Sequence, residues 1–299
     1  MMLTSHSQVL EMAKSKTLKK IVVAAAEDEP VLEAVKIAMQ EKIIIPILVG
    51  NRKAIEEIAT SVNLDVSDVE IIDEKDPVQS SKIAVSLIRE GKGEILMKGL
   101  VSTAEIMRRV LDKENGLRKG ATLSHIAFFE IPTYHKILAV TDAALNVAPT
   151  FEEKVDILKN GVLAFSKLGV EIPKVAVLAA VETVNPKMEA TVHAAMLTMQ
   201  CKRKQIKECI VDGPLALDNA VDKEACRHKK IESEVGGDSD LLLCPDIESA
   251  NVLYKSLSFL GRGISGAIIM GARVPMVLTS RADSERSKLI SIAYAAAMG

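Results

Sequence analysis

Short continuous runs of apolar residues alternate along the first part of the chain with segments in which apolar positions recur at helical spacing. Runs of strand length are predicted at 20–26, 43–50, 68–73 and 93–99. Amphipathic helices are predicted between and after them, at 29–41, 52–60, 77–90 and 103–111. Apolar strands that alternate with amphipathic helices predict a parallel sheet with helices on both faces.

The alternation changes between residues 116 and 146. Two extended segments, 121–131 and 135–146, are joined by Pro132-Thr133-Tyr134, which predicts an antiparallel hairpin or a long ribbon. Beyond them the alternation resumes. Strands are predicted at 174–181, 206–213, 240–246, 267–271 and 274–280, and helices at 151–168, 186–199, 218–229, 249–260 and 283–297.

Domain organisation follows from this change and from the length of the chain. The chain has 299 residues, which is enough for about two domains at ~100–200 residues each. We expect a first α/β domain of residues 1–140 and 281–299, because the last helix is expected to pack back on the first sheet, and a second α/β domain of residues 141–280. Both are expected to hold mostly parallel sheets covered by helices.

Composition and charge exclude several classes of protein. Hydrophobic residues make up 48% of the chain and aromatic residues only 3%, so the core is expected to be aliphatic, and little aromatic surface is left to stack nucleobases. Lys and Arg number 38 against 40 Asp and Glu, which is not the basic balance of a nucleic-acid binder. The longest segment without a charged side chain, residues 190–201, has twelve residues, whereas a membrane span needs ~20. The N-terminus lacks a secretory signal and the four cysteines include no CxxC pair, which predicts reduced thiols in a cytoplasmic protein.

Polar residues that follow predicted strands are the first candidates for chemistry, because ligands of open α/β sheets bind at the carboxyl ends of the strands. After the strand at 93–99, Ser102 or Thr103 caps a helix whose open N–H groups attract an anion. Arg108, one turn farther along, is a candidate to bind the same anion with its guanidinium group, and a position on a solvated face is the alternative. A capping box of Ser102 with Glu105 explains the first turn without any ligand.

Two further strand ends carry candidates. Asp142 and Asn146 end the extended segment at 135–146, although Asp and Asn also favour chain reversals whatever the function. Asp246 follows the apolar residues of the strand predicted at 240–246, and the next helix carries Asn251 and Lys255.

The last candidates lie near the C-terminus. The glycines at 261, 263 and 266 match G-x-G-x-x-G, but they follow a helix and precede a strand, so a dinucleotide fingerprint is rejected; Gly266 remains as a close approach to a ligand. Ser280 and Arg281 end a predicted strand, and Asp283 or Ser284 caps the final helix. A hydroxyl beside a guanidinium at such a turn suits an oxyanion or a phosphate group. A helix N-cap beside an ordinary surface arginine explains the same residues without a ligand.

Six segments that keep their order along residues 20–297 resemble the phosphate acetyltransferase and butyryltransferase family. They are EDEP at 27–30, KGLVSTAEIMRR at 98–109, TDAALNVAPTFEEKVDI at 141–157, VDGPLALDNAV at 211–221, CPDIESANVLYKS at 244–256 and GAIIMGARVPMVLTSRADS at 266–284. The forms TDAALN and SRADS look most like the members that act on butyryl or branched-chain acyl groups.

The resemblance implies two α/β domains similar to those of isocitrate and isopropylmalate dehydrogenases, with the active site in a cleft between them. It also implies the reversible reaction of a short-chain or branched acyl-CoA with phosphate to give acyl phosphate and CoA. In that reaction Ser280 would donate a hydrogen bond to the thioester carbonyl, while Arg281 and Arg108 would bind phosphate. CoA is then a substrate, no bound cofactor or metal is expected, and the protein is expected to form a homodimer or a higher homo-oligomer. Residues expected to bind substrate are Ser102, Thr103, Asp142, Asn146, Asp246, Asn251, Lys255, Gly266 and Asp283.

Alternatives remain at this point. Ser287 stands where some acetyl members carry an aspartate proposed as the base toward the CoA thiol, so the general acid or base is open. A phosphate acetyltransferase, a dehydrogenase of the related two-domain fold and a ligand-binding module without turnover are the competing functions. Such dehydrogenases usually need a metal held by clustered aspartates, and no D-x-x-x-D cluster appears in the relevant segments; the histidines and cysteines show no metal spacing.

Overall fold

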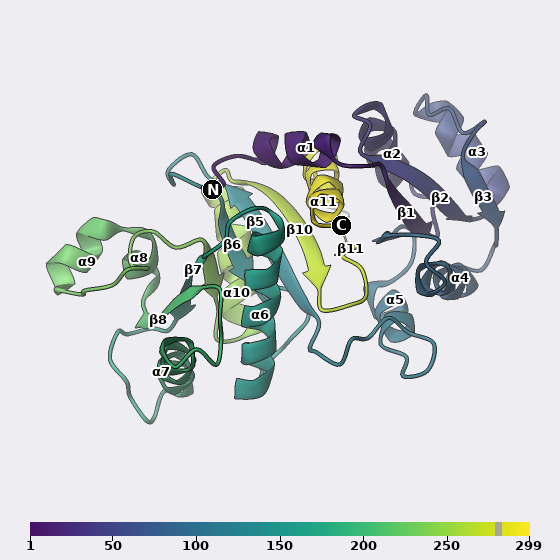
Figure 1. Cartoon of the computed structure of the whole chain (residues 1–299). Coiled ribbons are helices and arrows are strands. Elements are labelled where there is room, and N and C mark those ends of the chain that lie inside the picture. Colours follow the sequence, from purple (N-terminus) through teal and green to yellow (C-terminus); the bar gives the residue numbers. More distant parts are fainter. Residues whose placement is uncertain (279–282) are drawn as a thin grey trace. The chain divides into compact units, whose positions relative to one another are not determined.

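A computed structural model describes residues 1–278 and 283–299 of the chain (Figure 1). The chain divides into two compact units. Unit 1 consists of residues 1–6 and 122–265, and unit 2 consists of residues 7–121 and 266–299. None of the helices in the described part of the chain combines the length and the apolar character that a membrane span requires.

The strands of unit 2 lie in the order β3-β2-β1-β4-β11-β10. Strands β1 to β4 and β11 pair in parallel, and β10 pairs antiparallel with β11. The C-terminal ends of the parallel strands therefore lie at the same edge of the sheet. The bounds are β1 Lys19–Ala24, β2 Ile44–Gly50, β3 Glu70–Asp73, β4 Ile95–Lys98, β10 Ile264–Met270 and β11 Met276–Val277.

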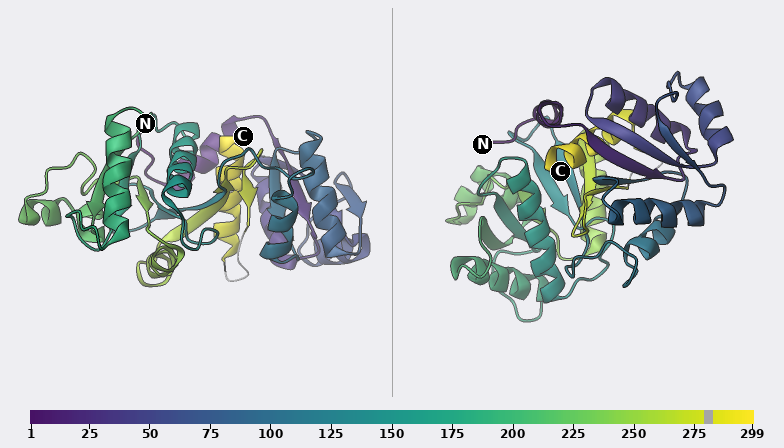
Figure 2. Two further views of the ribbon diagram at one scale, coloured as in Figure 1. Left: turned by 90° about the horizontal axis from the view of Figure 1, so that it is seen from below. Right: turned by 45° about the vertical axis from the view of Figure 1, so that its right-hand side comes forward.

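Helices cover both faces of the unit 2 strands (Figures 1 and 2). One face carries α2 Glu29–Gln40, α3 Arg52–Ser61 and α11 Glu285–Met298, and the other carries α4 Pro77–Arg89 and α5 Thr103–Val110. Pro30 and Pro77 stand in the first turns of α2 and α4, where a backbone N–H has no partner within the helix. A further helix, α1 His6–Ser15, was not predicted. Its buried apolar side chains are only Val9 and Ala13, which is too few for a clear helical pattern.

The strands of unit 1 lie in the order β5-β6-β9-β7-β8. Strands β6, β9, β7 and β8 are parallel, whereas β5 pairs antiparallel with β6, with Ala127 opposite Val140. The bounds are β5 Ser124–Glu130, β6 Leu138–Thr141, β7 Lys174–Leu178, β8 Ile210–Leu215 and β9 Leu241–Leu243.

Helices α6 Phe151–Lys167 and α7 Glu189–Lys202 lie on one face of the unit 1 strands. The other face carries α8 Leu217–Val221, α9 Lys223–Lys229 and α10 Ile247–Lys255, which continues as a π-helical turn over Ser256–Leu260. Helix α6 approaches β9 closely, because a Cβ on Gly161 would lie 2.3 Å from Leu241 Cδ2. The core around these elements is aliphatic, as the composition predicts, and Phe128, Phe129 and Phe165 are among its few rings.

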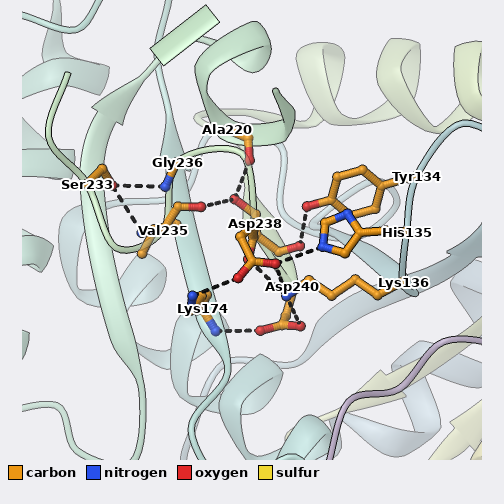
Figure 3. Close-up of polar contacts among 11 residues, drawn as sticks. Tyr134, His135, Lys136, Lys174, Ala220, Ser233, Val235, Gly236, Asp238 and Asp240 are labelled. Carbon is orange, nitrogen blue, oxygen red and sulfur yellow. Dashed lines mark hydrogen bonds and ion pairs between the residues drawn. The ribbon is translucent and has the colours of Figure 1, made fainter. Parts of the chain in front are cut away.

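A cluster of ion pairs joins the N-terminal ends of three unit 1 strands (Figure 3). Lys136, before β6, lies 2.7 Å from Asp240 and 3.1 Å from Asp238, both of which precede β9. Lys174, the first residue of β7, lies 2.7 Å from Asp238. His135 Nε2 is 2.8 Å from the same carboxylate. Asp238 is therefore shared by three basic side chains, and the cluster stabilises this end of the sheet.

The predicted fold class, α/β with mostly parallel sheets covered by helices, is confirmed. The antiparallel ribbon predicted after residue 116 is the β5–β6 pair. The compact units divide the chain after residues 6, 121 and 265, whereas the expected domains divide it after residues 140 and 280. The difference has a physical reason. Strand β5 pairs with β6, and β6 pairs with β9, so both belong with unit 1, whereas β11 pairs with β4 and belongs with unit 2.

Candidate functional site

In unit 2, the predicted anion site begins where β4 ends. Ser102 is the N-cap of α5, and its hydroxyl accepts a hydrogen bond from the backbone N–H of Glu105 at 3.1 Å. Thr103 is the first residue of the helix. The reciprocal half of the expected capping box is not formed in the described contacts, because the Glu105 carboxylate is directed toward two arginines instead.

These arginines make Glu105 the centre of a small ion cluster. Arg108 Nη1 lies 2.6 Å from Glu105 Oε2, and Arg109 Nη2 lies 2.9 Å from Oε1. The Glu105 side chain is 11% exposed, whereas the Arg108 side chain is 70% exposed. The carboxylate is thus a nearly buried anchor, and the guanidinium group of Arg108 reaches solvent, where it is accessible to an anion.

In unit 1, Asp142 lies directly after β6 and is 3% exposed. Its Oδ1 accepts hydrogen bonds from the backbone N–H groups of Ala144 and Leu145, both at 2.9 Å. Its Oδ2 accepts from the N–H of His125 at 3.1 Å and from Asn146 Nδ2 at 2.5 Å. The carboxylate of this predicted substrate-binding residue is therefore occupied in holding the turn after β6.

The beginning of α10 is attached to the same turn. Asp246 is the N-cap of α10 and accepts a hydrogen bond from Ser249 N at 2.8 Å. Asn251 donates from Nδ2 to the carbonyl oxygen of Ala143 at 3.1 Å. The structure thus brings Asp142, Asn251 and Asp246 together at the C-terminal ends of β6 and β9, the edge at which α/β proteins bind ligands.

Lys255, in contrast, ends α10 and is exposed. It stands nine residues after Asp246, which corresponds to about 13 Å along the helix axis. It is not part of the group at the start of α10.

The C-terminal candidates have different outcomes. Gly266 packs against α11, since a Cβ would lie 2.4 Å from Ile290 Cγ2 and 3.0 Å from Tyr294 Cδ2. Close packing therefore explains this glycine without a ligand. Ser284, and not Asp283, is the N-cap of α11, while the backbone oxygen of Asp283 accepts a hydrogen bond from Lys288 Nζ. Ser280 and Arg281 lie outside the described residues.

Sequence reasoning did not single out Lys154, the fourth residue of α6. It is 5% exposed, and its Nζ lies 3.1 Å from His193 Nδ1 on α7. Burial lowers the pKa of Lys154. A signal for it exists in the sequence, because Lys154 occupies a buried helical position in register with Ile157, Leu158 and Gly161, where an apolar residue is normal.

The cysteine at this edge is not a poised nucleophile. Cys244 follows β9 directly and is buried. Burial, with smaller contributions from Asp246 and Asp142, raises the pKa of its thiol to about 12. Because the thiolate is the reactive form, Cys244 is not activated at neutral pH. Among the described residues, no three His, Cys, Asp or Glu side chains form a group that could hold a metal ion.

Comparison with known proteins places these features in a family. Residues 5–81 and 77–296 match the family described as phosphate acetyl/butaryl transferase. A phosphate butyryltransferase from Clostridium acetobutylicum is 47% identical over 295 residues, which cover 99% of this chain and 98% of the relative. A phosphate acetyltransferase from Thermotoga maritima is 44% identical over 289 residues, covering 97% of this chain and 98% of the relative. A crystal structure of a branched-chain phosphotransacylase from Enterococcus faecalis V583 superimposes with a TM-score of 0.83 and 35% identity, covering 94% of this chain and 99% of that one.

Proposed function

The chain belongs to the phosphate acetyl/butaryl transferase family, and we propose that it catalyses the reversible reaction of a short-chain or branched acyl-CoA with phosphate to give acyl phosphate and CoA. The observation that carries this proposal is identity at 47% along almost the whole length of a phosphate butyryltransferase. CoA is a substrate in this reaction and not a resident cofactor.

The reaction combines bond formation, bond cleavage and a proton transfer. An oxygen of monohydrogen phosphate attacks the thioester carbonyl carbon, the C–S bond breaks, and the departing thiolate takes up the proton that the phosphate loses. Arg281 and Arg108 bind phosphate in this proposal, and Ser280 donates a hydrogen bond to the carbonyl oxygen as negative charge develops on it. Donation to a developing oxyanion contributes ~3–4 kcal/mol in other acyl transfers.

The low reactivity of the Cys244 thiol, at the C-terminal end of β9, favours direct attack by phosphate without an acyl-enzyme. An acyl-enzyme needs an activated nucleophile. Cys244 is buried, with its pKa raised to about 12 by that burial. Binding acyl-CoA and phosphate together then supplies the rate enhancement that comes from holding two reactants in contact.

The acyl group of the proposal is butyryl or a branched chain of similar length, and acetyl is the alternative. The relatives carry both names, phosphate butyryltransferase and phosphate acetyltransferase, at 47% and 44% identity. One methylene group changes discrimination by only ~1–3 kcal/mol. We therefore expect several acyl-CoAs to react at graded rates.

The test is phosphate-dependent release of the CoA thiol from butyryl-CoA, isobutyryl-CoA and acetyl-CoA by the full chain. The proposal expects release with at least one of them, absent without phosphate and ranked by kcat/KM. Folded protein that releases no thiol from any of the three overturns it.

The setting of the proposed enzyme is the cytoplasm, with acyl-CoA, phosphate and acyl phosphate as partners and neither nucleic acid nor membrane among them. The formal net charge of -2 is not the strongly basic charge that is typical of nucleic-acid binders. A homodimer or higher homo-oligomer is the expected assembly, and light scattering coupled to size-exclusion chromatography measures its mass.

A further inference from the structure

Lys154 is a buried cation that lacks an ion-pair partner. It is 5% exposed, and none of the described carboxylates lies within the 4.0 Å that defines an ion pair with its Nζ. Glu189 and Asp246 are the carboxylates that act on it, at longer range. A buried charge without a paired counter-charge is costly, so an anion bound beside this ammonium group would offset that cost.

The one hydrogen-bond partner of the ammonium group in the described chain is a neutral ring. Burial, followed by the nearby Lys154, lowers the pKa of His193. The neutral ring accepts a hydrogen bond at Nδ1 from Lys154, 3.1 Å away, and presents its Nε2 to Glu189 Oε1 at 3.3 Å. Since an ammonium group has three N–H donors, two remain for a ligand.

The backbone around Lys154 also favours an anion. Lys154 lies in the first turn of α6, which follows β6, and His193 lies one turn into α7, which follows β7. The N-cap of α7 is Met188, and no side chain caps this helix. The N–H of Thr191 in its first turn donates to the carbonyl oxygen of Met188 at 2.9 Å, and the positive end of the helix dipole faces the same edge of the sheet. Glu189, the first residue of α7, is 80% exposed, so solvent and salt screen its charge at this helix end.

We propose that Lys154, supported by His193 and by the uncapped N-terminus of α7, binds a phosphate group of a substrate. The identity of that substrate rests on the proposed function, in which inorganic phosphate and the phosphates of CoA are the two sources. The binding geometry itself is independent of turnover. Lys154 holds the phosphate by direct hydrogen bonds from Nζ, and His193 is a positioning residue that orients the ammonium group.

The test is isothermal titration of the full chain with inorganic phosphate, CoA and dephospho-CoA. Lys154→Met removes the charge at nearly constant volume, and Lys159→Met, on the exposed side of the same helix, is the matched control. We expect Lys154→Met to raise Kd about tenfold or more for one of these ligands, and Lys159→Met to leave all three values unchanged. A loss for inorganic phosphate identifies the phosphate substrate. A loss for CoA with dephospho-CoA unaffected identifies the 3′-phosphate, and a loss for both CoA forms identifies the pyrophosphate.

The outcome that overturns the inference is a folded Lys154→Met protein with wild-type Kd for all three ligands. If that variant fails to fold, wild-type protein with labelled histidine decides the question by NMR, with His193→Gln assigning the signal. The His193 ring signals should shift on addition of inorganic phosphate or CoA, and signals that stay in place at saturation overturn it. Titration needs no catalysis, so failure of acyl transfer and failure of this site are distinguished.

Discussion

Arg108 Nη1 donates to Glu105 Oε2 across 2.6 Å, one turn apart on α5. The same carboxylate holds Arg109 through its other oxygen at 2.9 Å. Because the Glu105 side chain is nearly buried and its two oxygens face two guanidinium groups, it restricts the positions that Arg108 can take. Glu105 thus pre-orients the arginine that is proposed to bind phosphate.

Glu105→Gln should therefore weaken the use of phosphate more than it slows the chemical step. Loss of the carboxylate charge frees Arg108, and we expect KM for phosphate to rise about three- to tenfold, the range of one charged hydrogen bond near the surface. Steady-state kinetics with phosphate varied at saturating acyl-CoA measures this. Glu114→Gln, an exposed change in the loop after α5, is the control. An unchanged KM with a reduced kcat would contradict a positioning role.

Ser280 and Arg281, which lie outside the described part of the chain, have different proposed roles, so we expect their variants to differ in kinetics. Ser280→Ala should lower kcat by about 10²- to 10³-fold with little change in KM, because the hydroxyl acts on charge that develops in the transition state. Arg281→Ala should chiefly raise KM for phosphate. Both variants are assayed with the best acyl-CoA of the panel. Normal turnover by both removes them from the site.

The extent to which the sequence predicts this protein depends on the kind of feature. Strands such as β1 and β2 were predictable because buried parallel strands are continuous apolar runs, and Pro30 marks the start of a helix. Helix α1 was not, since only two of its buried side chains, Val9 and Ala13, are apolar. The π-helical turn at Ser256–Leu260 lies within the helix predicted at 249–260, and no local signal distinguishes it from the α-helix before it.

At the candidate site, the sequence indicates which residues stand at strand ends but not which of their atoms are already occupied. Asp142 was expected to face substrate, and only the structure shows four N–H donors on its carboxylate. The pairing of Lys154 with His193 joins residues 39 positions apart, and no spacing rule predicts such a contact. Tertiary packing decides both.

Asp238 is expected to make the unfolding free energy of the protein depend on pH in the acidic range. Burial alone would raise the pKa of its carboxyl, but hydrogen bonds from Lys174, His135 and Lys136 outweigh it and lower the pKa well below the usual value of 3.8. A lowered folded-state pKa stabilises the protein above the unfolded pKa, and this contribution is lost as the pH falls below about 4. Asp238→Asn should cost about 1–3 kcal/mol of unfolding free energy at pH 7.

The check is the melting temperature of both proteins between pH 7 and pH 2. Their difference should narrow progressively below about pH 4, because wild type loses there what the variant already lacks. Asp68→Asn, an exposed aspartate, serves as control and should follow wild type. A difference that stays constant down to pH 2 would show that Asp238 is not the titrating group.

Gly266 is expected to matter for packing and not for binding. A Cβ would lie 2.4 Å from Ile290 Cγ2, so Gly266→Ala should destabilise the protein by about 1–3 kcal/mol through overpacking. Ile290→Ala opens space at the same contact, and the double variant should be more stable than the sum of the two single changes predicts. Denaturant unfolding measures the cycle. Strict additivity, or a rise in KM without loss of stability, would return Gly266 to the list of ligand contacts.

Asp142→Asn tests whether the turn after β6 is held by charge. The carboxylate accepts four hydrogen bonds, two at each oxygen, and an amide in either orientation would place its NH₂ group against two N–H donors. We expect a loss of about 2–4 kcal/mol of unfolding free energy, the cost of leaving buried donors unsatisfied. Asn146→Ala removes one of those donors and should be milder. Because Asn251 attaches α10 to the same turn through Ala143, the variant should also raise KM for CoA as the start of α10 shifts. A folded Asp142→Asn protein with wild-type stability and a selectively raised KM would instead assign the carboxylate to direct contact with substrate.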